Sequence, residues 1–231
     1  MPGVLSEYAL ADAKLLARKP GNISMLEAAS LPLVGITSWN ALIDRANIKA
    51  GQKVLVHAGT GGVGHFALQL AKCMGAKVIA TSSSEEKLAK LKELGADELI
   101  NYKEHPEWGK EVLKITNNEG VDHVMEVGGG GTFGESVRAA KLGGHIALIG
   151  VLSGPAVSEI ILPRIFLKQV RLSGIAMANQ QSQIAMIEFI EKHNIKPIIS
   201  DTFDLANLSD AFQHQIDNKH FGKISITMGA E

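Results

Sequence analysis

The feature that most constrains this chain is a glycine-rich loop between a short apolar run and a segment with helical periodicity. The apolar run covers residues 53–58, the helical segment covers residues 63–74, and the loop is Gly59-Thr60-Gly61-Gly62-Val63-Gly64. A G-x-G-x-x-G sequence between a strand and a helix is typical of the phosphate-binding turn of a dinucleotide-binding fold. We therefore expect a Rossmann-type domain that binds a dinucleotide at residues 59–64.

The three motif glycines have different expected roles. Gly59 permits the tight turn, and Gly61 lets a pyrophosphate approach the backbone. Gly64 lets the helix pack close to the sheet. The free N–H groups at the helix start then face the phosphate charge.

Apolar runs rich in valine and isoleucine alternate with helical segments along most of the chain, which predicts a parallel sheet with crossover helices. Six runs are predicted to be strands: 53–58, 77–81, 98–102, 121–127, 145–151 and 170–175. The predicted helices are 24–45 with an interruption around Pro32 and Gly35, 63–74, a helix from a Ser83/Glu86 capping box to Gly95, 108–116 and 180–193. The chain closes with a strand–helix–strand pattern that ends at 223–226. This rhythm predicts an α/β fold with a doubly wound, six-stranded parallel sheet.

Composition excludes several classes of partner. The 231 residues are 45% hydrophobic and 20% charged, with a formal net charge of -1, so no broad positive field attracts nucleic acid or an anionic membrane. No apolar run reaches the length of a membrane span, and the first residues lack the features of a signal peptide. We expect a cytoplasmic protein.

The single cysteine, Cys73, can form neither an internal disulfide nor a four-cysteine zinc site.

The end of the second predicted strand indicates which dinucleotide is bound. NAD-binding proteins usually place an Asp or Glu there to bind the ribose hydroxyls, whereas this chain has Thr81-Ser82-Ser83-Ser84. The hydroxyls of Ser82 and Ser83 can donate to a phosphate that a carboxylate would repel, and Lys87 follows with a positive charge. The pattern favours NADP(H) over NAD(H). Two alternatives stay open: Glu85 or Glu86 could bend back to a ribose, and Lys87 could be a solvated surface lysine.

Several segments together resemble the C-terminal two-thirds of the medium-chain dehydrogenase/reductase superfamily, and most closely its quinone oxidoreductase-like and zinc-type alcohol dehydrogenase-like members. The segments are 28–42, 58–64, 94–97, 100–102 and 220–224. In NADP-dependent relatives, a lysine and a tyrosine that match Lys87 and Tyr102 contact the 2'-phosphate. The resemblance also implies that Gly128, Gly150 and Val151 line the cofactor cleft and that Thr37 lies near the nicotinamide.

The chain departs from the family pattern in two respects. The family begins with a GroES-like catalytic domain, and the resemblance to this chain starts only near the end of that domain, at Gly3 to Tyr8. We therefore expect residues 1–23 to be a small remnant of the catalytic domain, 24–177 to be the dinucleotide-binding domain, and 178–231 to be a C-terminal segment. Zinc-using relatives have a metal ligand where this chain has Leu33, so no zinc site is expected.

The leading functional hypothesis is an NADP(H)-dependent oxidoreductase that transfers a hydride between nicotinamide and a carbonyl, quinone or activated alkene, without zinc. Two alternatives are a zinc-type alcohol dehydrogenase fragment whose ligands lie elsewhere, and a cofactor-binding module or truncated remnant without catalysis of its own. A short-chain dehydrogenase is disfavoured, because neither Tyr8 nor Tyr102 has a lysine four residues on. The residues assign no catalytic proton donor and no particular small-molecule substrate.

The sixth predicted strand, 170–175, is expected to lie at the edge of the sheet. Exposed edges are usually paired or covered, because they carry unpaired backbone groups. This edge and the family resemblance together predict a homodimer formed through residues 170–175.

Overall fold

The computed structural model describes residues 8–156 and 162–228 of the chain. The first seven residues of the expected remnant, 1–23, lie outside the described residues. In the described ranges no helix is both long enough and apolar enough to cross a membrane.

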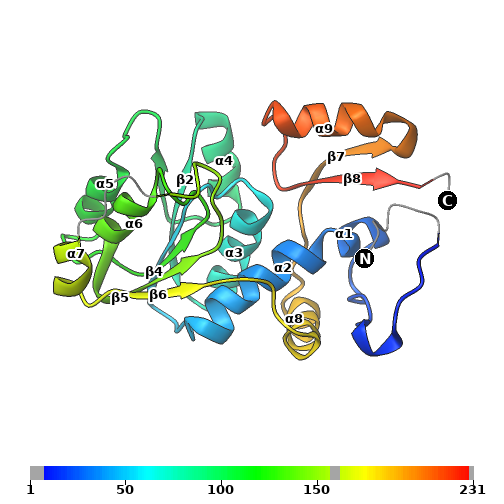
Figure 1. Cartoon of the computed structure of the whole chain (residues 1–231), viewed down its shortest axis with the longest axis horizontal. Helices are drawn as coiled ribbons and strands as arrows, with labels where there is room; N and C mark the ends of the chain where they lie inside the picture. Colours follow the sequence, from blue (N-terminus) through cyan, green and yellow to red (C-terminus); the bar gives the residue numbers. More distant parts are fainter. Residues whose placement is uncertain (1–7, 157–161, 229–231) are drawn as a thin grey trace.

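The larger part of the molecule is built on a parallel sheet that confirms the predicted fold class (Figure 1). Its strands are β1 Lys53–Val56, β2 Lys77–Ser82, β3 Glu98–Asn101, β4 Val121–Glu126, β5 Ala140–Leu148 and β6 Arg171–Gly174. They lie in the order β3-β2-β1-β4-β5-β6, and every neighbouring pair is parallel. The chain order reverses between β1 and β4, and a crevice at the carboxyl ends of the strands is the usual ligand site at such a reversal.

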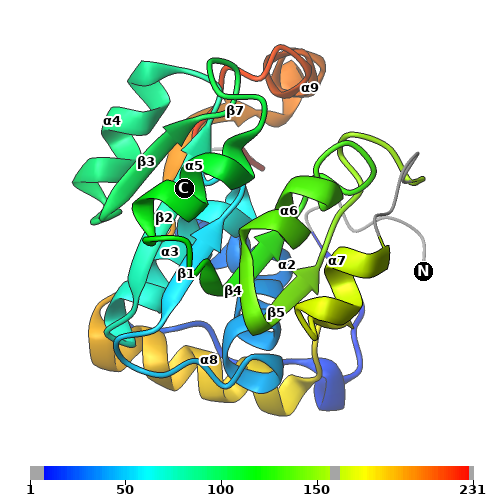
Figure 2. The ribbon, with the colours of Figure 1, turned by 90° about the vertical axis from the view of Figure 1, so that its left-hand side faces the viewer.

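Helices cover both faces of this sheet. One face carries α2 Leu31–Trp39, α3 Gly62–Cys73 and α4 Glu85–Glu93, and the other carries α5 Trp108–Ile115, α6 Phe133–Ala139 and α7 Leu162–Leu167. Figure 2 shows the second set in front of the sheet. Because successive strand residues point to opposite faces, Val54 and Val56 pack under the first set and Leu55 under the second. A sheet buried on both faces explains the continuous apolar runs of the sequence.

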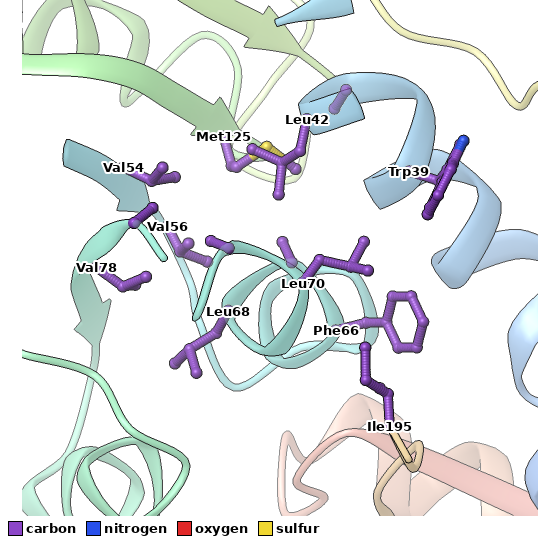
Figure 3. Close-up of a cluster of buried hydrophobic side chains, with 14 of the residues drawn as sticks. Trp39, Leu42, Val54, Val56, Phe66, Leu68, Leu70, Val78, Met125 and Ile195 are labelled. Atoms are coloured by element: carbon purple, nitrogen blue, oxygen red, sulfur yellow. The ribbon is translucent and has the colours of Figure 1, made fainter. Parts of the chain in front are cut away.

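The core under α3 joins the sheet to the C-terminal part of the chain. In Figure 3, Val54, Val56 and Val78 lie on the sheet side of α3, and Phe66 points away from them toward Ile195. Phe66 is fully buried, and Ile195 belongs to the same cluster of buried side chains. Helix α3 and the segment after residue 178 therefore share one core.

The C-terminal part adds a long helix and a second sheet. Helix α8 covers Gln180–His193, as predicted, and ends where Asn194 takes a left-handed conformation with φ 50°. A parallel pair of strands follows, β7 Ile199–Asp204 and β8 Lys223–Thr227, with α9 Leu208–Ile216 between them. The short helices are η1 Ala13–Leu15, α1 Met25–Ala29 and η3 Leu205–Asn207. Figure 1 shows β7, β8 and α9 beside the six-stranded sheet, on the side of α2.

The predicted start of α4 is wrong by one residue. The cap is Ser84, whose hydroxyl accepts from the backbone N–H of Lys87, and not Ser83. Glu86 does not complete a capping box, because its carboxylate accepts from Lys90 Nζ at 2.9 Å. The helix starts late because β2 stays paired with β3 through Ser82 and Asn101.

The predicted start of β5 is also wrong. The strand begins at Ala140, where it pairs with Val121, and it ends at Leu148, before Val151. Sequence reasoning missed the first five residues because Lys141, Gly143 and Gly144 interrupt the apolar pattern. It also did not predict α6 and α7, which precede β5 and β6.

The interruption expected around Pro32 and Gly35 falls at Ser30 instead. Pro32 lies in the first turn of α2, where its missing N–H costs no hydrogen bond. Gly35 is inside α2, and a Cβ there would lie 3.0 Å from the Met186 sulfur of α8. The glycine therefore serves helix packing, and the chain continues from α2 into a π-helical segment, η2 Asn40–Arg45.

Candidate dinucleotide-binding site

The glycine loop is tied to the neighbouring strand β2 at its first two residues. The Ala58 N–H donates to the hydroxyl of Thr81 at 3.1 Å, and the Gly59 N–H donates to the carbonyl of Thr81 at 2.9 Å. Ala58 has a φ of 50°, a left-handed conformation that costs a residue with a side chain roughly 1–2 kcal/mol. The turn then closes as Gly61 N–H donates to the carbonyl of Ala58 at 3.1 Å.

The spacing around each glycine shows what its missing side chain permits. A Cβ at Gly64 would lie 2.6 Å from the Ala58 carbonyl oxygen and from the Gly59 Cα, so the helix starts directly against the loop. The nearest described atom to a Cβ at Gly61 would be the Ala58 oxygen at 3.6 Å, so this side of the loop is open. Within the described residues, no side chain caps the amino end of α3. Its first N–H groups are available to a phosphate.

Helix α2 lies against the same loop and carries Thr37. The Ser38 hydroxyl lies 2.8 Å from the Val34 carbonyl and 3.1 Å from the Val63 carbonyl, and a Cβ at Gly62 would lie 2.8 Å from Val34 Cγ1. Thr37 itself is buried in α2, next to these contacts. Its proximity to a nicotinamide stays a prediction.

The carboxyl end of β4 is shaped by Glu126, a residue that sequence reasoning missed. Its fully buried carboxylate accepts from the N–H groups of Gly128 at 2.6 Å and Gly129 at 2.9 Å. It also accepts from the hydroxyls of Thr132, at 2.7 Å, and Ser136. The only sequence signal was a carboxylate inside an apolar strand. These bonds hold the loop in which Gly128 was predicted to line the cleft.

The carboxyl ends of β4 and β5 approach each other closely, as the predicted cleft requires. A Cβ at Gly150 would lie 2.6 Å from the Val127 carbonyl oxygen. Val151 follows with 56% of its surface exposed, so its side chain is not part of the core. Gly128, Gly150 and Val151 thus lie at one edge of the sheet, where the glycine loop also lies.

A cavity of about 380 Å³ opens at the carboxyl ends of β1, β3 and β4. Its walls include His57, Tyr102, Trp108, Gly128 and Thr132. The rings of His57 and Trp108 stack with centroids 5.0 Å apart, and the Tyr102 ring lies 5.6 Å from His57. Flat, partly polar walls of this kind suit a nucleobase.

The serines after β2 occupy three different environments. Ser82 is 1% exposed, and in the described part of the chain its hydroxyl has no hydrogen-bond partner. Ser83 is half-buried, and Ser84 is used by the cap of α4. A contact between Ser82 or Ser83 and a phosphate therefore stays a prediction.

Positive charge gathers at this end of the sheet. Lys87 donates to the carbonyl of Asn218 at 2.7 Å and to its side-chain oxygen at 3.3 Å, so it is not a freely solvated lysine. Desolvation lowers the pKa of Lys87, the Glu86 carboxylate raises it, and the charges of Lys90 and Lys103 lower it. Lys103 directly follows Tyr102, and sequence reasoning missed it.

The carboxylates that could have bound a ribose have other partners. Glu85 accepts from the Asn101 amide at 2.8 Å, and Glu86 pairs with Lys90 at 2.9 Å. The first contact holds Glu85, on the first turn of α4, against Asn101 at the end of β3. The second holds Glu86 against Lys90, one turn further along α4.

The glycine loop is also tied to the C-terminal segment. The His65 ring, fully buried in α3, donates from Nδ1 to the Gly61 carbonyl at 3.1 Å and accepts at Nε2 from the Ile198 N–H at 3.2 Å. Since Nε2 is an acceptor, the ring must be neutral, and burial lowers the pKa of His65 to about 4. The Gly222 N–H donates to the Thr60 carbonyl at 2.8 Å.

The described residues contain no group of three or more His, Cys, Asp or Glu side chains that could hold a metal ion. Leu33, at the position of a ligand in zinc-using relatives, is on α2 with 56% of its surface exposed. Zinc independence stays a prediction.

Comparison with known proteins identifies the family. A family model described as zinc-binding dehydrogenase matches residues 62–192. This chain belongs to the zinc-binding dehydrogenase family. A zinc-type alcohol dehydrogenase-like protein of Schizosaccharomyces pombe is 37% identical over 229 residues, which are 97% of this chain and 66% of that protein. The chloroplast envelope quinone oxidoreductase homolog of Arabidopsis thaliana is 32% identical over 231 residues, which are 97% of this chain and 68% of that protein. The predicted membership in the medium-chain dehydrogenase/reductase superfamily is confirmed.

Solved structures of this dehydrogenase family share the fold. An NAD-dependent alcohol dehydrogenase aligns with a TM-score of 0.86 and 35% identity, over 92% of this chain and 62% of that one. A mycobacterial protein solved in complex with NADPH aligns with a TM-score of 0.85 and 29% identity, over 94% of this chain and 69% of that one. The chain spans between 62% and 69% of the length of these four relatives.

The neutral His65 makes stability depend on pH. Because its pKa is 6.5 in the unfolded chain and about 4 in the folded chain, the unfolded chain binds more protons in that window. The free energy of unfolding is expected to fall as pH drops from 6.5 to 4, with His65 accounting for about 3 kcal/mol. Urea unfolding at several pH values measures this slope.

His65→Gln is the matched variant, because glutamine has a donor and an acceptor but does not titrate. Its slope should be shallower than that of the unmodified chain. His123, whose pKa burial also lowers to about 4, is present in both proteins and cancels in the difference. Equal slopes would show that His65 is not held neutral.

Proposed function

We propose that this chain binds NADP(H) and serves an oxidoreductase that transfers a hydride between nicotinamide and a carbonyl, quinone or activated alkene, without zinc. The observation that carries the proposal is the edge formed by the open glycine loop and the basic end of β2. The uncapped start of α3 suits the pyrophosphate, and Lys87 with Lys103 suits a further phosphate.

The choice of NADP(H) over NAD(H) rests on charge. Lys87 and Lys103 raise the local positive potential, while Glu85 and Glu86 are engaged by Asn101 and Lys90. A 2'-phosphate would meet lysines there, whereas Glu85 and Glu86, the two carboxylates nearest the place that NAD-binding proteins use, already have partners. The mycobacterial neighbour with NADPH supports this choice, and the NAD-dependent neighbour is the reason to test it.

The chain's own residues would hold the cofactor and exclude water. The loop 59–64 binds the pyrophosphate, the cavity beside His57 accepts the adenosine half, and Gly128, Gly150 and Val151 line the crevice toward Thr37. The bound nicotinamide would supply the hydride. The names of the relatives, a quinone oxidoreductase homolog and an alcohol dehydrogenase-like protein, support the class of acceptor.

The cofactor preference is testable by titration. We expect the full chain to bind NADPH more tightly than NADH, and Lys87→Ala to weaken NADPH binding by about tenfold while leaving NADH binding almost unchanged. Lys114→Ala on α5, which removes an exposed lysine paired with Glu111, is the control. Tighter binding of NADH, or equal losses for both cofactors in Lys87→Ala, would contradict the proposal.

Turnover and metal content test the chemistry. The purified chain should reduce a quinone, enone or aldehyde with NADPH and should contain far less than one zinc per chain after dialysis without chelator. Stoichiometric zinc would instead favour the zinc-type alcohol dehydrogenase. Binding of NADPH without turnover on any of the three acceptor classes would favour a binding module.

We also propose that a second copy pairs at β6, the edge strand of the sheet. This edge is apolar: Leu172 is 53% exposed on β6, and Phe166 and Leu167 are 64% and 69% exposed on the adjacent α7. An unpaired strand edge flanked by large apolar side chains is typical of a dimer interface.

Sedimentation at micromolar concentration tests the dimer. We expect the unmodified chain to sediment as a dimer and Leu172→Lys to shift it toward monomer, because each copy would place a lysine in the apolar contact. Ile216→Lys, at a side chain 75% exposed on α9, is the control and should leave the dimer intact. A monomeric unmodified chain would refute the proposal.

A further inference from the structure

The hydroxyl of Thr81 lies at the centre of a short hydrogen-bond chain. Thr81 is fully buried near the carboxyl end of β2. Its oxygen accepts from the Ala58 N–H at 3.1 Å, and it lies 2.9 Å from Nδ1 of His57. One hydroxyl therefore connects the strained start of the glycine loop to an aromatic wall of the cavity.

The chemistry of these groups fixes where the protons are. The Ala58 N–H is a donor, so the Thr81 oxygen is an acceptor in that bond and its own proton needs another acceptor. Nδ1 of His57 is the acceptor within reach. The opposite arrangement, with Nδ1 protonated, would leave the hydroxyl proton without a partner in a fully buried position, which is unfavourable. His57 is thus neutral, with its remaining proton on Nε2.

The surroundings of His57 agree with this assignment. Burial lowers the pKa of His57, which keeps the ring neutral at pH 7. The ring stacks on Trp108 and lines the 380 Å³ cavity. Among the described residues, Nε2 has no hydrogen-bond partner, so a donor is left for a molecule in the cavity.

We propose that Thr81 and His57 are positioning residues for the dinucleotide: Thr81 holds the Ala58 amide and the His57 tautomer together, and His57 presents Nε2–H to the adenosine half. This inference rests on the proposed NADP(H) binding. The Thr81 hydroxyl then has two effects. It binds the turn that receives the pyrophosphate, and it fixes the tautomer in which His57 has a donor toward the base or ribose. The Thr81 hydroxyl adds to the Gly59 N–H bond to the Thr81 carbonyl, which holds the same turn against β2.

The proton assignment can be measured on the chain without ligand. In ¹⁵N-labelled histidine spectra at pH 7, His57 should show a proton on Nε2 and an unprotonated Nδ1. The Thr81→Val variant, which has no hydroxyl, should lose this fixed tautomer. A proton on Nδ1, or a doubly protonated ring, in the unmodified chain would overturn the proposal.

Binding tests the role in positioning. NADPH titration should show about tenfold weaker binding for Thr81→Val, the loss expected for one buried hydrogen-bonding hydroxyl, and near-normal binding for Thr81→Ser, which restores it. Thr116→Val is the matched control. Thr116 is also buried, donates to the Val112 carbonyl at 2.7 Å and accepts from the Gly120 N–H at 2.9 Å, but lies at the end of α5.

The outcomes separate this inference from the function on which it rests. If the unmodified chain binds NADPH and Thr81→Val binds it equally well, the positioning role is refuted and the cofactor proposal stands. If Thr116→Val weakens binding as much as Thr81→Val, the effect is one of general stability and the role is again refuted. If the unmodified chain does not bind NADPH, both proposals fail.

Discussion

The candidate binding site lies at the carboxyl ends of the strands, and its arrangement depends on the close approach of α3 to the end of β1. A Cβ at Gly64 would lie 2.6 Å from two backbone atoms of the turn, so only glycine allows the helix to start there. This contact aims the first N–H groups of α3 at the reversal point between β1 and β4. We expected Gly64 to serve packing against the sheet, and the nearest atoms belong to the loop itself, at Ala58 and Gly59.

Two different parts of the chain, strand β2 and the C-terminal segment, hold the glycine loop in place. Thr81 of β2 binds its first two N–H groups, and the C-terminal segment binds it through His65 and Thr60. The same segment holds Lys87 through Asn218. The glycine loop and Lys87 are therefore both hydrogen-bonded to the segment 198–222, although this segment is remote in sequence from the glycine motif. A movement of β7 and β8 would shift the loop and Lys87 together.

The sequence predicted the sheet well because its inner strands β2, β1 and β4 are almost wholly buried and rich in apolar residues. It failed at the start of β5: Ala140 pairs with Val121, and a bulge that contains Lys141 and two glycines separates this pair from the next, His145 with His123. The glycine loop was predictable because its requirement for small residues is local. The role of Thr81 was not, because it acts on a loop that follows a different strand. The role of Glu126 was also missed, although it binds the loop directly after its own strand.

The sequence also did not decide between NAD(H) and NADP(H). The sequence has two glutamates next to the place where NAD-binding proteins use a carboxylate, so a count of residues leaves the choice open. The structure shows that Asn101 and Lys90 take these carboxylates, because β3 and the next turn of α4 lie beside them. What a ligand would meet is the charge left over after such internal pairing. Lys87 is itself engaged by Asn218, with Lys103 nearby, and our proposal that the end of β2 accepts a phosphate rests on these two lysines.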